Sequence, residues 1–351
     1  MLGANVLASF SHTPAMRILS GIQPSGTLHL GNYFGAIQQH VELQETAGGA
    51  DRAFYFIANY HSLTTLQDAA RLRALTRDVA IDYLTLGLDP KKATFYRQSD
   101  VPEVTELAWL LSCCVGKGLL ERATSYKDKV AKGLEASMGL FNYPVLMAAD
   151  ILICRSTLVP VGKDQQQHVE MAQDMAGSFN AAFAREVFVR PEWRFSIGAK
   201  VPGIDGEKMS KSYENTIPIF LPDDMTDKQA WKTYFASIKT DSKGVEEPKD
   251  PNDTLMTLYR LLAPAKAAEF GPVYVKGGVG YGDLKKRLHD AYNETFGPLR
   301  EKRRAIAADE AFVEAVLVEG AKRARAVAGE VMTAARDACG IVTARDTHTS
   351  R

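Results

Sequence analysis

Residues 17–32 read RILSGIQPSGTLHLGN, and this stretch decides the fold. It opens with an apolar run over 17–20 that Gly21 stops, which predicts a short buried strand. The next residues, 21–26, are rich in Gly, Pro and Ser and predict a loop. A helix is expected from Leu28 to Glu45. The order strand, loop, helix is the first half of a βαβ unit.

Residues 33–98 extend this pattern. A dense apolar and aromatic run, AFYFIA at 53–58, predicts a buried strand, and TFYRQ at 94–98 predicts another. Between them, apolar residues recur at helical spacing, and Gly87 is placed to end that helix. The residues of this stripe are Leu72, Leu75, Val79, Tyr83 and Leu86. Strands that alternate with helices imply right-handed crossovers and a parallel sheet, so the fold class is α/β.

The rest of the chain is mostly helical. We expect helices through most of 104–183, an exposed loop over 197–215, and helices with polar interruptions from Thr226 onward. A boundary near 218–222 gives three parts. They are an N-terminal extension at 1–15, a parallel-sheet domain at 16–220 and a helical domain at 221–351. Either Met1 or Met16 could be the true start.

Composition restricts the class of protein. Of 351 residues, 46% are hydrophobic and 24% charged, and 42 Lys and Arg balance 42 Asp and Glu. These values are typical of a globular protein and argue against a sequence-blind nucleic-acid coat or a disordered chain. No apolar run approaches a bilayer span, so no membrane association is expected. The four cysteines form no CxxC pair, which suggests reduced thiols in the cytoplasm and neither a zinc site nor a disulfide framework.

The first candidate site is the start of the helix after the 17–20 strand. Ligands of parallel sheets bind beyond the carboxyl ends of strands, where a helix N-terminus attracts phosphate. Gly26 and Gly31 allow close approach of a ligand, and His29 and Asn32 share one helix face. The alternative is a capped helix with a surface histidine.

The second candidate is GEKMSKS at 206–212. It combines two lysines and two hydroxyl side chains on a loop that begins with glycine. Mobile lysines suit negative charge that develops and leaves, such as a departing pyrophosphate. A solvated basic loop is the alternative.

The third candidate is Asp150, a lone acid within the apolar run LMAADILI. A carboxylate in such surroundings must be paired or must accept a hydrogen bond from a ligand. The alternative is a structural aspartate bonded to a nearby backbone N–H or to Arg155.

These segments resemble those of a known family. PSGTLHLGN resembles the HIGH motif of class I aminoacyl-tRNA synthetases, and KMSKS is their second motif letter for letter. Asn32 stands where HIGH has its final histidine, so a cationic role there is in doubt. Five further segments look like those of bacterial tryptophanyl-tRNA synthetases. They are GIQPSG at 21–26, MAADIL at 147–152, VPVGKDQQQH at 159–168, KSYENTI at 211–217 and GVGYGDLK at 278–285.

The resemblance implies a Rossmann-like, nucleotide-binding catalytic domain and a helical C-terminal domain that binds the anticodon. It implies an ATP-dependent ligase that forms tryptophanyl-adenylate and pyrophosphate, and then transfers tryptophan to the 3′-terminal adenosine of its tRNA. The implied partners are L-tryptophan, ATP and tRNA(Trp), in a cytoplasmic homodimer. Mg²⁺ is expected to arrive with ATP and to lack a dedicated protein site.

The resemblance also implies roles for individual residues. The catalytic set is His29, Asn32, Lys129, Lys208 and Lys211. The ATP-binding set is Gln23, Pro24, Ser25, Gly31, Asn32, Gly162, Lys163, Asp164, Val201, Lys208, Met209, Ser210, Lys211 and Ser212. The tryptophan-binding set is Asp150, Tyr143, Met147, Val159, Val161, Gln165, His61 and Gln23, with Asp150 as acceptor for the indole N–H.

Several alternatives stay open. Asp164 could simply cap the helix that follows it, and Lys127 or Lys129 could be solvated surface lysines. A basic set in the C-terminal region could contact RNA or form an ordinary charged helix face. Its members are Arg300, Lys302, Arg303, Arg304, Lys322, Arg323 and Arg325. The rival functions are a tyrosine-specific synthetase, a small-molecule adenylyltransferase and an RNA-binding paralogue without catalysis.

Overall fold

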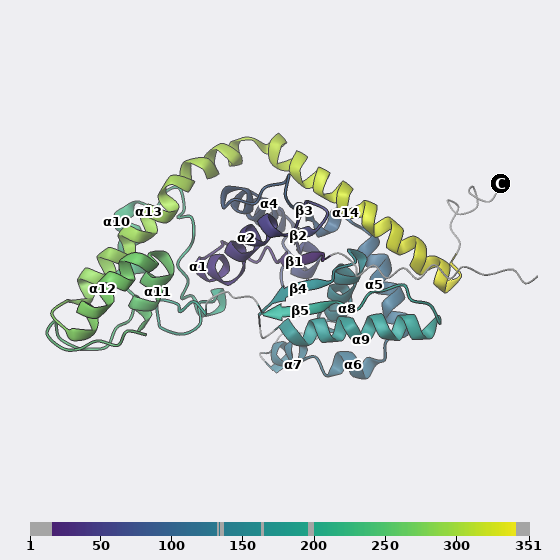
Figure 1. The fold of residues 1–351 in the computed structure, drawn as a ribbon, viewed down its shortest axis with the longest axis horizontal. Helices are drawn as coiled ribbons and strands as arrows, with labels where there is room; N and C mark the ends of the chain where they lie inside the picture. The colour runs from purple at the N-terminus through teal and green to yellow at the C-terminus, as the bar shows by residue number, and fades with distance from the viewer. Residues whose placement is uncertain (1–15, 132, 134–136, 163–164, 196–199, 342–351) are drawn as a thin grey trace, which may run out of the picture.

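The structure is a computed structural model that describes residues 16–131, 133, 137–162, 165–195 and 200–341. At its centre is a five-stranded parallel sheet in the order β3-β2-β1-β4-β5 (Figure 1). The strands are β1 (Ile18–Ile22), β2 (Ala53–Ile57), β3 (Thr94–Arg97), β4 (Leu158–Val161) and β5 (Glu192–Phe195). The predicted α/β fold with a parallel sheet is therefore confirmed.

Helices cover both faces of the sheet. In chain order they begin with α1 (Leu30–Asn32), η1 (Tyr33–Ile37), α2 (Gln38–Thr46), α3 (Asn59–Ser62), α4 (Ala69–Thr85), η2 (Gln98–Asp100), α5 (Glu103–Cys114), α6 (Lys117–Glu121), α7 (Thr124–Ala131), α8 (Met138–Ile153) and α9 (Gln166–Ala182). The later ones are η4 (Lys211–Tyr213), α10 (Asp227–Ala230), η5 (Trp231–Phe235), α11 (Thr254–Leu262), α12 (Pro264–Lys276), α13 (Tyr281–Ala308) and α14 (Glu310–Cys339).

Alternate side chains of β2 contribute to two different hydrophobic cores. Tyr55 and Ile57 belong to the core that includes residues of α4 and of α11–α13, whereas Phe54 and Phe56 belong to the core that includes residues of α5, α8 and α9. Every residue of β2 is buried. A strand covered on both faces reads as a continuous apolar run, which explains the AFYFIA pattern.

Most local predictions agree with the structure. The expected strands and the helix after Leu28 lie where the patterns indicate, and Gly87 ends α4 with a φ of 112°. Two strands were missed, β4 and β5. Pro160 lies inside β4 and argues against a strand, and β5 is largely exposed and lacks an apolar run.

The loop expected over 197–215 is not simply exposed, so that prediction needs correction. Residues 196–199 lie outside the described parts of the chain. Within the remainder, Val201, Met209 and Asn215 are buried. The buried side chain of Asn215 forms hydrogen bonds with other parts of the same loop. Met209 contacts α1 at Gly31.

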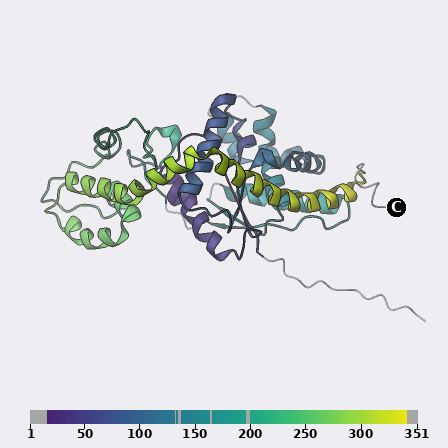
Figure 2. The ribbon, with the colours of Figure 1, turned by 90° about the horizontal axis from the view of Figure 1, so that it is seen from above.

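The long helices α13 and α14 lead from the helical end of the molecule back across the sheet (Figures 1 and 2). Contacts between α14 and β3 are close, because a Cβ on Gly320 would lie 1.8 Å from the Phe95 carbonyl oxygen. The apolar side of α14 is buried, including Leu317, Ala321, Ala324, Ala328, Val331 and Ala335. The domain boundary near residue 220 stays a prediction, since α14 packs on the catalytic sheet.

The C-terminal basic residues have a role that the two alternatives did not include. Arg303 pairs with Asp82 at 2.6 Å, and Lys302 donates to the Thr85 carbonyl. Farther along, Arg325 pairs with Glu103 and Arg323 donates to the Pro90 carbonyl. These side chains attach α13 and α14 to the sheet domain. No helix in the described parts of the chain has the length and apolar character needed to cross a membrane.

Candidate active site

A cavity of about 510 Å³ lies at the carboxyl ends of the strands. All eight residues expected to bind tryptophan line it. They are Gln23, His61, Tyr143, Met147, Asp150, Val159, Val161 and Gln165. Gly162, which belongs to the expected ATP-binding set, lines it as well. The structure thus brings together residues that are spread over 140 positions of sequence.

The parallel topology explains this convergence. Gln23 follows β1, His61 lies in α3 just after β2, and Gly162 follows β4. Because parallel strands end at one edge of the sheet, the segments that follow them meet there. Apolar walls from α8 and β4 complete the cavity.

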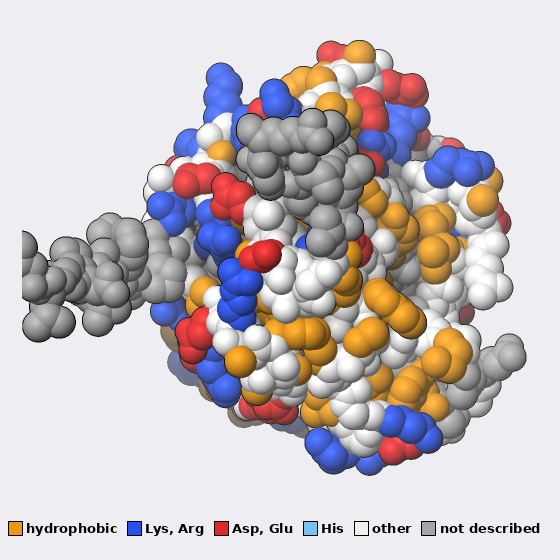
Figure 3. All heavy atoms as spheres, turned by 90° about the vertical axis from the view of Figure 1, so that its right-hand side faces the viewer, with side chains coloured by type: hydrophobic (Ala, Val, Ile, Leu, Met, Phe, Trp, Pro, Cys, Tyr) orange, Lys and Arg blue, Asp and Glu red, His pale blue; other side chains and the backbone are white. Residues whose placement is uncertain are grey.

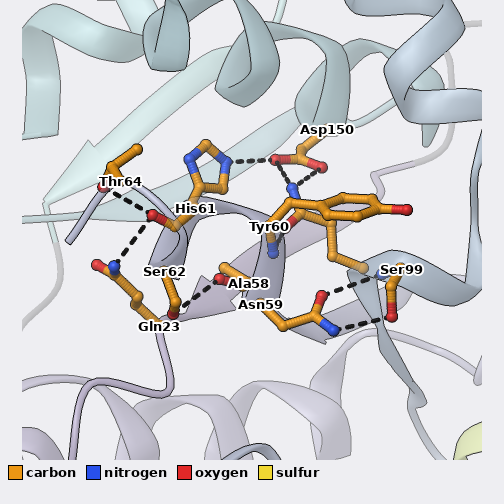
Figure 4. A network of polar contacts seen from close by, with 10 residues as sticks. Gln23, Ala58, Asn59, Tyr60, His61, Ser62, Thr64, Ser99 and Asp150 are labelled. Carbon is orange, nitrogen blue, oxygen red and sulfur yellow. Dashed lines mark hydrogen bonds and ion pairs between the residues drawn. The ribbon is translucent and has the colours of Figure 1, made fainter. Parts of the chain in front are cut away.

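Asp150 is the buried carboxylate of this cavity, with 4% of its surface exposed. His61 and Asp150 point toward each other, with 2.9 Å between Nε2 and Oδ2 (Figure 4). The amide nitrogen of Gln98 lies 2.9 Å from each carboxylate oxygen. Burial raises the pKa of Asp150, and the hydrogen bonds from His61 and Gln98 oppose that rise.

These contacts differ from those of the structural alternative for Asp150. That alternative named a backbone N–H or Arg155 as partner, but Arg155 lies 3.9 Å from Glu330 instead. Asp150 is held by side chains that line or adjoin the cavity. Its oxygens therefore remain beside a space that a ligand can enter.

Gln98 is a site residue that the sequence analysis did not identify. It follows β3 directly and is 1% exposed. Its position at the carboxyl end of a predicted strand was the available signal, since polar side chains there face the ligand edge of a parallel sheet.

Tyr143 and Gln165 form the polar side of the cavity. The Tyr143 hydroxyl lies 2.8 Å from Nε2 of His168, and Nδ1 of His168 lies 3.0 Å from Oε1 of Gln165. Burial raises the pKa of Tyr143 to about 12, so its hydroxyl stays protonated at neutral pH. This side of the cavity offers hydroxyl and amide groups to a charged ligand.

The KMSKS segment lies directly on the PSG loop. Nζ of Lys211 donates to the carbonyl of Gly26 at 2.8 Å and to Oγ of Ser25 at 3.3 Å. Burial lowers the pKa of Lys211 from 10.5 to about 8. Two segments that lie 185 residues apart in sequence therefore form one polar surface.

Met209 and Asn215 hold this arrangement. The backbone N–H of Gly31 points at Sδ of Met209, 3.3 Å away, and Met209 donates its own N–H to the Val201 carbonyl. Asn215, 1% exposed, accepts from the Ser210 backbone and donates to Asp205. These contacts define the shape of the loop over residues 201–215.

His29 is buried, contrary to the alternative of a surface histidine. It is 6% exposed, and its Nδ1 has no hydrogen-bond partner among the described residues. Burial, with a smaller effect from Lys211, lowers the pKa of His29 to about 4, so it is neutral at pH 7. Asn32 caps the helix by accepting from the His29 backbone N–H at 3.1 Å.

Of the other predicted site residues, four have described side chains, one has only its backbone described, and two lie outside the described residues. Lys208 is exposed, Pro24 is buried, and the hydroxyls of Ser210 and Ser212 bond to each other at 2.9 Å. Lys129 belongs to α7, but its side chain is not described. Lys163 and Asp164 lie outside the described residues, so the capping alternative for Asp164 stays open. Within the described chain, no group of three or more His, Cys, Asp or Glu could hold a metal ion.

Comparisons with known proteins agree with this geometry. A family model described as class I tRNA synthetases (W and Y) matches residues 11–297. The tryptophan–tRNA ligase of Rhodopirellula baltica is 51% identical over 329 residues, which cover 93% of this chain and all of the relative. That of Fusobacterium nucleatum is 49% identical and covers 93% and 98%.

Solved structures give the same result. The tryptophanyl-tRNA synthetase of Campylobacter jejuni, complexed with ADP and tryptophan, superposes with a TM-score of 0.84 at 47% identity. The match covers 93% of this chain and all of that one. The fold, the two motifs and these matches define an ATP-dependent aminoacyl-tRNA ligase of class I. Within that class, the chain belongs to the bacterial tryptophan–tRNA ligases, which attach tryptophan to tRNA.

Proposed function

We propose that the cavity binds L-tryptophan and the adjoining PSG and KMSKS segments bind ATP. The tryptophan carboxylate attacks the α-phosphate of ATP, which forms tryptophanyl-adenylate and releases pyrophosphate. A ribose hydroxyl of the terminal adenosine of tRNA then attacks the acyl carbon and releases AMP. The first step requires positioning of two anions and stabilisation of phosphate charge.

In this proposal, Asp150 and the apolar walls of the cavity recognise the indole side chain of tryptophan. Indole offers one N–H on a large apolar ring, and Asp150 is a buried acceptor next to Met147, Val159 and Val161. The hydroxyl of Tyr143 and the amide of Gln165 receive the ammonium group.

Stabilisation of the phosphates falls to the basic and polar groups around the PSG loop. Lys211 contacts that loop, Lys208 is exposed in the same KMSKS segment, and Nδ1 of His29, which has no partner among the described residues, is proposed to donate to a phosphate oxygen. Asn32 supports the helix start, and the expected catalytic role of Lys129 stays a prediction. Mg²⁺ accompanies ATP and is held mainly by phosphates and water.

The observation that carries this proposal is the cavity itself, with one buried carboxylate among apolar walls and Lys211 on the neighbouring loop. The test is amino-acid-dependent ATP–pyrophosphate exchange with all twenty amino acids. Exchange with tryptophan alone is expected. Equal exchange with tyrosine or phenylalanine would overturn the assignment of the cavity.

Residues 221–351 are proposed to bind the anticodon of tRNA(Trp). Support comes from α10–α12, which lie at the end of the molecule away from β4 and β5 (Figure 1). We place the enzyme in the cytoplasm, where its tRNA substrate is found.

A homodimer is proposed through the surface formed by α5 and α8. Trp109 is 68% exposed and Met138 is 71% exposed. Near them, a groove of about 420 Å³ is lined by Leu63, Ala108 and Leu146. Hydrophobic side chains gather in patches on the side of the molecule where α5 lies (Figure 3). Light scattering should give the mass of two chains for the wild type and of one for Trp109→Glu.

A further inference from the structure

Gln98 has a fixed orientation. Its Oε1 accepts a hydrogen bond from the Tyr60 backbone N–H at 3.0 Å, so the other end of the amide must be the NH₂ group. That nitrogen lies 2.9 Å from both oxygens of Asp150. The amide therefore links α3, the short helix that follows β2, to the carboxylate on α8.

The contacts of Asp150 leave room for one more donor. An ionised carboxylate has about four acceptor positions. Gln98 contacts both oxygens and His61 contacts Oδ2, which occupies three positions within the described residues. With the plane of the carboxylate held from two sides, the remaining acceptor position has a defined direction.

The chemical state of Asp150 depends on the same donors. Burial favours the neutral acid, which would present an O–H donor in place of an acceptor. A hydrogen bond from an amide favours the ionised form, because the carboxylate is the better acceptor. Gln98 thus affects both the direction and the charge of the group.

We propose that Gln98 is a positioning residue that fixes Asp150 as an acceptor and so determines selection of ligands with a ring N–H. This inference rests on the proposed role of Asp150 in binding indole. Gln98 itself acts through Asp150 and needs no contact with the substrate.

The test compares tryptophan with its benzothiophene analogue, in which sulfur replaces the ring N–H. For each substrate, kcat/KM is measured by ATP–pyrophosphate exchange in wild type, Gln98→Met and Gln98→Glu. The methionine variant keeps the side-chain length and removes all three hydrogen bonds of the amide. In either variant, the preference for tryptophan should fall roughly tenfold, through a higher KM for tryptophan. The KM for ATP and the kcat/KM of the analogue should stay near wild-type values.

Gln44→Met is the matched control. Gln44 is also a buried bridging amide, which donates to the Gly87 carbonyl and accepts from the Asp89 backbone. Its replacement should lower the melting temperature but leave the substrate preference unchanged. A purely structural role for Gln98 would give the same result in both methionine variants and would overturn the proposal.

Asp150→Ala separates the two levels of the argument. If that variant keeps the wild-type preference, the role of Asp150 fails and the inference fails with it. If Asp150→Ala removes the preference but both Gln98 variants retain it, only the inference about Gln98 is refuted. Gln98→Met added to Asp150→Ala should have no further effect on the preference. If Gln98→Met does not fold, Gln98→Glu alone decides, since it retains the shape of the side chain.

Discussion

Lys211 should confer a pH dependence on the use of ATP. Its ammonium group is partly buried against the Gly26 carbonyl, and burial lowers its pKa from 10.5 to about 8. If the ammonium form binds and stabilises phosphate charge, activity is lost as pH rises through the pKa. The perturbation is therefore a rise in pH, compared between wild type and Lys211→Arg.

The size of the effect follows from the pKa. With a pKa of about 8, the protonated fraction falls roughly tenfold between pH 7 and pH 9. The kcat/KM for ATP reports groups of the free enzyme, so it should fall by the same factor. The fall in kcat should begin at higher pH, because bound triphosphate favours the ammonium form.

The assay is tryptophan-dependent ATP–pyrophosphate exchange from pH 6.5 to 10. Lys211→Arg keeps a positive charge throughout, so its kcat/KM for ATP should lack this fall even if its activity is lower. Lys208→Arg is the matched control and should retain the fall. A wild-type profile that stays flat to pH 10, or an equal fall in Lys211→Arg, would refute the reasoning.

Three further predictions concern specificity and stability. Asp150→Ala should lower the ratio of kcat/KM for tryptophan to kcat/KM for phenylalanine. Asp150→Asn should lower the free energy of discrimination between the two substrates by only ~1 kcal/mol. An unchanged ratio in the alanine variant would exclude Asp150 as the indole acceptor. Gly320→Ala should lower the melting temperature, because its Cβ would meet the Phe95 carbonyl, whereas Gly329→Ala on the same helix meets no atom within 4 Å and should raise it slightly. His40, with a pKa lowered to about 4 by burial, binds its proton more weakly in the folded state. The free energy of unfolding should therefore fall by about 3 kcal/mol as pH drops from 6.5 to 4, and His40→Phe should lose that part of the dependence in urea titrations.

Local sequence patterns identify the elements of this fold well, because burial on both faces leaves a continuous apolar run. AFYFIA at 53–58 is an example, whereas the stripe that ends before Gly87 is identified by its helical spacing. The strand β4 was not predicted from the same kind of pattern, because Pro160 lies inside it and argues against a strand. Its place between β1 and β5 depends on pairings with distant residues that no local pattern records.

The site residues likewise differ in whether the sequence alone can identify them. Asp150 can be identified from sequence because an acid is unusual in an apolar run, and His29 because it starts a helix after a strand. Gln98 could not be assigned to Asp150, since 52 residues separate them and the contact depends on how α8 packs on the sheet. For Asn215, the sequence shows only a polar residue after KMSKS. Its function as the buried link between Asp205 and Ser210 appears only when the loop is folded.

The C-terminal helix shows how packing can change the meaning of a charge pattern. The edge strand β3 has one side without a partner strand, and exposed edges of this kind must be covered. Helix α14 covers it at close range because Gly320 has no side chain to separate the two backbones. Arginines on this helix then find carboxylates and carbonyls of the sheet domain, such as Glu103 and Pro90. Arg325 and Arg323 therefore attach α14 to the sheet domain, a role that the charge pattern alone does not reveal.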